Sequence, residues 1–245
     1  MIFMAITSIA KQSIIAYMKN LKLISLFSVP FLLALLIPLF TPMPTFMALG
    51  GTFLRTGSMP QLTLFETGVI ILSCLTSMFL ISFAFVAINL VIKSQRTLTN
   101  IKTEVLKGMK KYIFTLFAIY SFAWILTLAV TLIAFETGSE RIVGPLASLI
   151  TYTLLFYVPA AMVIDDQSIW RAFRTSATYL YRKPLYVLLW MLLAFSALSL
   201  LEFTLLEVMD HTLAEYAVLV VNSIILLPML VVIQTQMYLS KYTIL

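Results

Sequence analysis

Charged residues, glycine, cysteine and histidine are all scarce in this chain of 245 residues. Only 11% of the residues are charged, whereas soluble domains carry about a quarter. Hydrophobic residues make up 62%, so polar groups cannot cover the surface of the folded chain, and lipid must act as the solvent for most of it. The composition therefore predicts an integral membrane protein with a single membrane domain over residues 1–245.

The rarity of reactive residues limits the reactions that this protein could catalyse. The single cysteine, Cys74, lies in an apolar stretch, which excludes an internal disulfide and a cysteine metal cluster. No nucleotide-binding glycine loop, HExxH or GxSxG motif occurs. We therefore expect no cofactor and favour a non-enzymatic protein, with enzyme activity left open. The net charge of +6 follows the membrane topology, so we expect no nucleic-acid partner.

Six stretches are long and apolar enough to cross a bilayer, which requires roughly 20 mostly apolar residues. They predict an all-α fold, a polytopic bundle of six transmembrane helices. A cleavable signal peptide is the alternative for the first stretch, but it is long for one and no clear cleavage site follows. The stretches are residues 23–41, 68–92, 112–135, 142–164, 184–206 and 215–239.

The basic residues indicate the orientation, because cytoplasmic loops are enriched in lysine and arginine. With the N-terminus inside, 14 of the 16 basic residues face the cytoplasm, and only Arg55 and Arg141 face outside. We therefore expect a plasma-membrane protein with both termini in the cytoplasm.

Three segments, 3–21, 96–111 and 166–183, are amphipathic at helical spacing and predict helices in the cytoplasmic interface. The basic residues of the last two either contact lipid headgroups or bind a cytoplasmic protein, as coupling helices of transporters bind an ATPase. These residues are Lys102, Lys107, Lys110, Lys111, Arg171, Arg174, Arg182 and Lys183.

The recurrence of a span, an amphipathic helix, a basic pair and a second span suggests an internal repeat. A shift of 72 residues places Gln95 on Gln167 and Lys110-Lys111 on Arg182-Lys183. We expect a threefold pseudo-repeat about an axis along the membrane normal, with the third copy permuted. Low identity leaves coincidence as the alternative.

Two acidic groups are candidate sites. Asp165 and Asp166 precede the arginine-rich segment, and we expect them to cap a helix, with cation or partner binding as the alternative. On the outer side, one helical face would present Glu207, Asp210, His211 and Glu215, which could hold a divalent metal. The competing interpretation is that the outer loops are acidic only because basic residues are kept on the cytoplasmic side.

The outer segment 41–67 is long and apolar and is interrupted by prolines and glycines. It predicts either a lid over a central cavity or a buried plug.

A stretch from Tyr157 to Pro184 resembles a pattern in prokaryotic multi-span proteins. A span ends there in proline and acidic residues, here Pro159 and Asp165-Asp166, and an amphipathic helix with an Ala-hydrophobe-x-x-Ser core follows, here Ala172 to Ser176. The pattern is similar to the membrane domain attached to some glycerophosphodiester phosphodiesterases and to related six-span families of unknown function. The resemblance implies a prokaryotic membrane module without enzymatic activity, because the chemistry of such proteins resides in a separate soluble domain.

Three functions remain open on the sequence. The leading hypothesis is a non-enzymatic membrane module that binds lipid or a partner protein through its basic cytoplasmic helices. A permease or channel component coupled to a separate ATPase is the alternative. A metal-dependent enzyme at the outer acidic cluster is the third.

Overall fold

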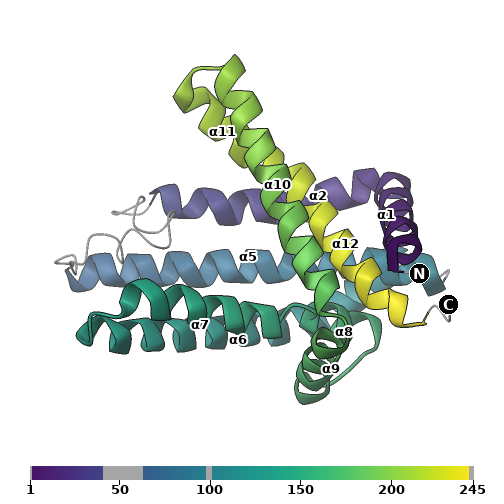
Figure 1. Ribbon diagram of the computed structural model, residues 1–245, viewed down its shortest axis with the longest axis horizontal. Helices are drawn as coiled ribbons and strands as arrows, with labels where there is room; N and C mark the ends of the chain where they lie inside the picture. The colour runs from purple at the N-terminus through teal and green to yellow at the C-terminus, as the bar shows by residue number, and fades with distance from the viewer. Residues whose placement is uncertain (1, 41–62, 98–100, 243–245) are drawn as a thin grey trace.

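The computed structural model describes residues 2–40, 63–97 and 101–242, and this part of the chain is helical without strands (Figure 1). Apolar chain in lipid forms helices because no solvent is present to satisfy the backbone N–H and C=O groups. The helices are α1 (Ile2–Lys19), α2 (Leu21–Leu36), η1 (Ile37–Phe40), α5 (Leu64–Thr97), α6 (Ile101–Glu136), α7 (Glu140–Leu154), α8 (Val158–Ile164), α9 (Ile169–Arg182), α10 (Pro184–Val208), α11 (His211–Val221), η2 (Asn222–Leu226), α12 (Leu227–Leu239) and η3 (Ser240–Tyr242).

Five helical segments are long and apolar enough to span a membrane, and a sixth is added if α1 and α2 count together. The helices α1 and α2 meet at an angle of 90°. Together with η1, α2 covers the first predicted span, residues 23–41, up to Phe40. The predicted all-α polytopic bundle is therefore confirmed. The other segments are Leu64–Thr97, Gly108–Glu136, Arg141–Ile164, Pro184–Val208 and His211–Tyr242. The lid or plug predicted over residues 41–67 lies almost entirely outside the described residues.

The long hairpin of α5 and α6 corrects one expectation. The sequence predicts an interfacial helix over 96–111 that leads into the next span, but α5 continues to Thr97 and α6 runs without a break from Ile101 to Glu136. Residues 101–111 contain no proline and are mostly good helix formers, so nothing ends the helix there. A separate helix, α9, therefore stands between α8 and α10, whereas the described residues hold none between α5 and α6, so the two predicted copies of the repeat differ in structure.

The fourth predicted span is discontinuous. It consists of α7 and α8, which are separated by a turn over residues 155–157. Pro159 stands in the first turn of α8, where its missing N–H costs no helical hydrogen bond. All residues from Val158 to Val163 are buried, so this short helix lies in the interior of the protein.

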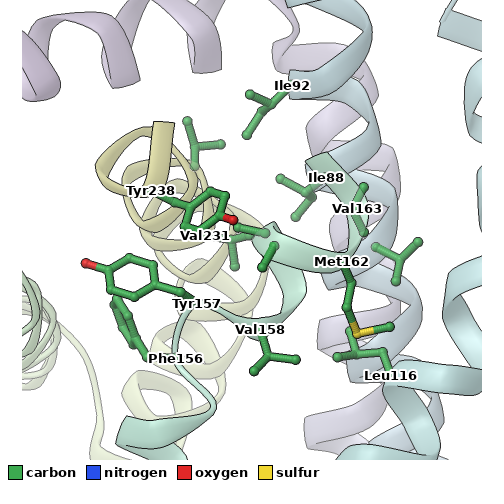
Figure 2. Packing of buried hydrophobic residues seen from close by; sticks show 14 of the residues in the cluster. Ile88, Ile92, Leu116, Phe156, Tyr157, Val158, Met162, Val163, Val231 and Tyr238 are labelled. Carbon is green, nitrogen blue, oxygen red and sulfur yellow. The ribbon is translucent and has the colours of Figure 1, made fainter. Parts of the chain in front are cut away.

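The main hydrophobic core surrounds α8, which packs against α5, α6, α9 and α12 (Figure 2). Met162 and Val163 lie close to Ile88 of α5 and Leu116 of α6, whereas Tyr157 lies beside Tyr238 of α12.

The α10–α11 hairpin leaves this core and projects from the α5–α6 bundle (Figure 1). Only the start of α10, at Tyr186 and Val187, is buried. The final span is distorted by a π-helical turn over Asn222–Leu226 directly before Pro228, and proline is an ordinary cause of such irregularity.

Candidate functional site

The helix α9 has three different faces, as its repeat of 100° per residue dictates. Ala172, Ser176 and Tyr179 are buried against the protein. A second face exposes apolar and aromatic side chains, including Trp170 at 84% exposure and Phe173. The third face is basic and exposed. It is formed by Arg171, Arg174 and Arg182. The predicted amphipathic helix over 166–183 is thus present as α9.

The buried face of α9 supports the break between α7 and α8. The hydroxyl of Ser176 donates to the carbonyl of Leu154 at 2.7 Å and accepts from the N–H of Tyr157 at 3.1 Å. The amide of Gln234 on α12 donates to the carbonyl of Phe156. Backbone groups freed at a break in a membrane helix need such partners. This explains why the Ala-hydrophobe-x-x-Ser core has small residues at Ala172 and Ser176, four positions apart on one helical face.

A third buried residue, Tyr179, connects α9 to the end of the chain. Its hydroxyl donates to the carbonyl of Met237 at 2.8 Å and lies 2.8 Å from the hydroxyl of Ser240. Burial raises the pKa of Tyr179 to about 12, so the phenol stays protonated and keeps this hydrogen bond at neutral pH. The end of α9 and the C-terminal segment η3 are therefore held together.

Asp165 has a different role from the capping that we expected. It ends α8, and Ser168 takes the N-cap position of α9 without a side-chain cap. The carboxylate instead forms a salt bridge with Lys241 and accepts hydrogen bonds from the hydroxyls of Tyr238 and Tyr242, each at 2.6 Å. Burial alone would raise the pKa of Asp165, but the hydrogen bonds from these three side chains outweigh it and hold the pKa below its ordinary value.

The neighbouring Asp166 binds the other side of the bundle. Lys111 of α6 lies 2.5 Å from its carboxylate, and the hydroxyl of Tyr112 donates to it at 2.8 Å. These hydrogen bonds lower the pKa of Asp166. Its backbone φ of 54° is in the left-handed region, where aspartate is one of the better-tolerated residues. The two adjacent carboxylates thus join the turn before α9 to η3 and to α6, which makes them structural ion-pair residues in this structure.

A basic pocket of about 490 Å³ lies between α9 and η3. Arg174, Arg182, Lys183 and Lys241 line it, together with the hydroxyl groups of Thr175, Thr178, Tyr179 and Ser240, and no carboxylate is among the lining residues. Lys241 is paired with Asp165, and Lys183 lies over the rings of Tyr179 and Tyr186. Among the side chains that the structure describes, no carboxylate pairs with Arg174 or Arg182.

The predicted basic residues therefore separate into groups. Arg174, Arg182 and Lys183 come together in the basic pocket, whereas Arg171 lies outside its lining. Lys111 is used in the ion pair with Asp166, and Lys110 is exposed. The side chains of Lys102 and Lys107 lie outside the described part of the structure. Sequence patterns missed Lys241, because nothing local relates it to α9.

The structure does not bring the candidate outer metal ligands together. In the described ranges 2–40, 63–97 and 101–242, no three histidine, cysteine or acidic side chains converge on a metal position. The helical face that we assumed is interrupted, because α10 ends at Val208, Met209 is extended and Asp210 begins a new helix. His211 and Glu215 lie 3.3 Å apart but are mostly exposed, and Glu207 lies on the preceding helix and is exposed to solvent.

A second cavity, of about 720 Å³, lies between α5, α6, α7 and α10. Its walls are mostly apolar, with Phe85 and Tyr120 at the middle of the long hairpin and Trp190 of α10 opposite. The break in the fourth span borders it, since Phe156 and Gln234 also line the cavity.

No family model, curated protein or solved structure matches the chain. The resemblance to the membrane domain of glycerophosphodiester phosphodiesterases therefore stays a prediction from the motif.

Proposed function

We propose that the protein is a non-enzymatic membrane module that binds anionic lipid through α9 at the cytoplasmic surface. The observation that carries the proposal is the division of α9 into three faces. Interfacial helices combine an apolar side with lysine or arginine on the polar side, and tryptophan and tyrosine gather at the headgroup level. The helix exposes Trp170 on its apolar side and also exposes Tyr181, which is typical of a helix at headgroup level.

The charge of α9 supports the same function. Its basic face has no carboxylate partner among the described side chains, so it is available for an anionic surface. Each basic residue near such a surface contributes about 1 kcal/mol. Three arginines therefore contribute roughly 3 kcal/mol, which is on the order of a hundredfold in lipid association.

The test compares the lipids that remain bound to the purified full chain in mild detergent, measured by native mass spectrometry. The variant R171E/R174E/R182E should bind anionic lipid at least about a hundredfold more weakly, because it loses the attraction of three arginines and adds repulsion. The charge-conserving variant R171K/R174K/R182K should retain it. Equal lipid retention in the two variants would contradict the proposal. A co-purifying protein that only the reversed variant loses, with lipid unchanged, would instead favour protein binding.

The second candidate is a permease component, which the apolar cavity beside the discontinuous α7–α8 span favours. Transporters often bind substrates where a spanning helix is broken. The largely apolar walls fit an apolar solute. Replacing Ser148 by tryptophan would fill the cavity, and flux of apolar dyes across proteoliposomes should then fall. If the unchanged protein shows no flux of these dyes, the permease function is excluded.

A further inference from the structure

We propose that the basic pocket between α9 and η3 is a specific site for a phosphate group. The inference rests on the proposed lipid-binding function and deepens it, because it distinguishes one pocket from the general charge of α9. Phosphate is carried by anionic lipid headgroups and also by soluble esters, and the position of the pocket favours the lipid.

The donors of the pocket match phosphate chemistry. Arg174, Thr178 and Arg182 follow one another at intervals of four residues and so lie along one side of α9. Each guanidinium offers five N–H donors in a planar fork that binds phosphate oxygens in pairs. The hydroxyl of Thr178 lies between the two arginines along this side, and hydroxyl groups also donate to phosphate oxygens.

The charge balance favours an anion over a neutral ligand. Asp165 pairs with Lys241 and partly neutralises it. The other three cations of the pocket have no carboxylate partner among the described side chains, namely Arg174, Arg182 and Lys183. Lys183 lies 5.0 Å and 5.7 Å from the ring centroids of Tyr186 and Tyr179, an arrangement that positions the ammonium group but leaves its charge intact. Three such charges around one cavity would bind a dianionic phosphate more strongly than a singly charged group.

The neighbouring faces of α9 place the pocket near headgroup level. Trp170 and Phe173 of the same helix are exposed on the apolar side. A lipid whose chains pack along that side could present its phosphate to the arginines one face further round. A lipid that ends in a phosphate monoester, with its second negative charge and free oxygens, fits the pocket better than a phosphodiester lipid.

The test titrates the detergent-solubilised full chain with dioctanoyl phosphatidic acid, dioctanoyl phosphatidylcholine and inorganic phosphate, and measures binding by native mass spectrometry. The variant R174Q/R182Q should bind phosphatidic acid at least tenfold more weakly. The matched control R171Q/K110Q removes the same charge from exposed residues outside the pocket, so it loses only the general attraction of the basic surface and should weaken binding at least threefold less than R174Q/R182Q does. Phosphatidylcholine should bind equally to all forms.

The outcomes of this titration distinguish a lipid phosphate from a soluble phosphate, and a specific pocket from general lipid binding by α9. If inorganic phosphate does not displace phosphatidic acid, the ligand of the pocket is a lipid. If it displaces phosphatidic acid efficiently, the ligand is a soluble phosphate. Both results support a phosphate site. Equal weakening in the two double variants would overturn the pocket while leaving general lipid binding by α9 intact. If R174Q/R182Q fails to fold, Thr178→Glu, which places a carboxylate at an exposed position of the pocket, should give the same tenfold loss, and unchanged binding in that variant would overturn the proposal.

Discussion

Asp165 and Asp166 differ in surroundings although they are adjacent. The side chains of Asp165 and Lys241 are only 10% and 19% exposed, whereas those of Asp166 and Lys111 are 53% and 59% exposed. An ion pair that is half in solvent contributes about 0–1 kcal/mol, but removing one partner of a shielded, hydrogen-bonded charge costs about 1.5–3 kcal/mol. The residue with the larger structural role is therefore Asp165.

The first prediction concerns the acid stability that Asp165 supplies. Because its folded-state pKa is below the ordinary value of 3.8, its contribution is complete at neutral pH and is lost as the pH falls through the folded-state pKa. Asp165→Asn should lower the free energy of unfolding by about 1.5–3 kcal/mol at pH 7. The difference from the unchanged protein should shrink below about pH 4.

Thermal unfolding in detergent at pH 7, 5, 4 and 3 measures this difference. Asp166→Asn is the control, because asparagine also adopts a positive φ and the ion pair it removes is half exposed. It should cost at most about 1 kcal/mol. A loss in Asp165→Asn that is the same at every pH would contradict the assigned role of the charge.

At the scale of the helix, the pairing of α5 with α6 depends on a close approach at Gly108. A Cβ atom at this position would lie 2.5 Å from a δ-carbon of Leu90, which is buried and has little room to move. A Cβ at Gly68, near the other end of α5, would meet nothing within 4 Å. The same substitution should therefore have opposite effects at the two glycines.

The second prediction uses this contrast. Gly108→Ala should destabilise the protein by about 1–2 kcal/mol, because overpacking outweighs the gain in helix propensity. Gly68→Ala should be neutral or stabilise it by up to about 1 kcal/mol. In a Leu90→Ala background, which frees the space, Gly108→Ala should no longer destabilise. Denaturant unfolding of the variants measures these effects, and equal destabilisation with and without Leu90 would rule out the contact as the cause.

At the scale of the whole molecule, α1 and the C-terminal segment lie at the same end of the bundle (Figure 1). The amide of Gln95 on α5 donates to the carbonyl of Ala16 on α1, and Arg96 lies 4.5 Å from the ring centroid of Tyr242. The turn between α6 and α7 lies at the opposite end. This arrangement agrees with an even number of crossings, and the charge distribution predicts that the end with α1 faces the cytoplasm.

The third prediction tests that orientation with single cysteines in a Cys74→Ser background. A cysteine at Thr137, in the α6–α7 turn, should react with a membrane-impermeant maleimide in intact cells. A cysteine at Gln12, exposed on α1, should react only after the membrane is permeabilised. The reverse pattern would place α9 and the basic pocket on the outer side and would exclude binding to cytoplasmic lipid.

Local composition determined the helical, membrane-spanning class of this protein and the position of α9. Both follow from short-range properties: about 20 apolar residues suffice to cross lipid, and a repeat of 100° separates the faces of a helix. Only the tertiary structure decided that Ser176 and Gln234 support a broken span, and that Asp165 binds Lys241, 76 residues away. It also decided that Lys241 joins Arg174 and Arg182 in one pocket. Such pairings depend on which distant helices pack together, and neither hydrophobic period nor local charge encodes that.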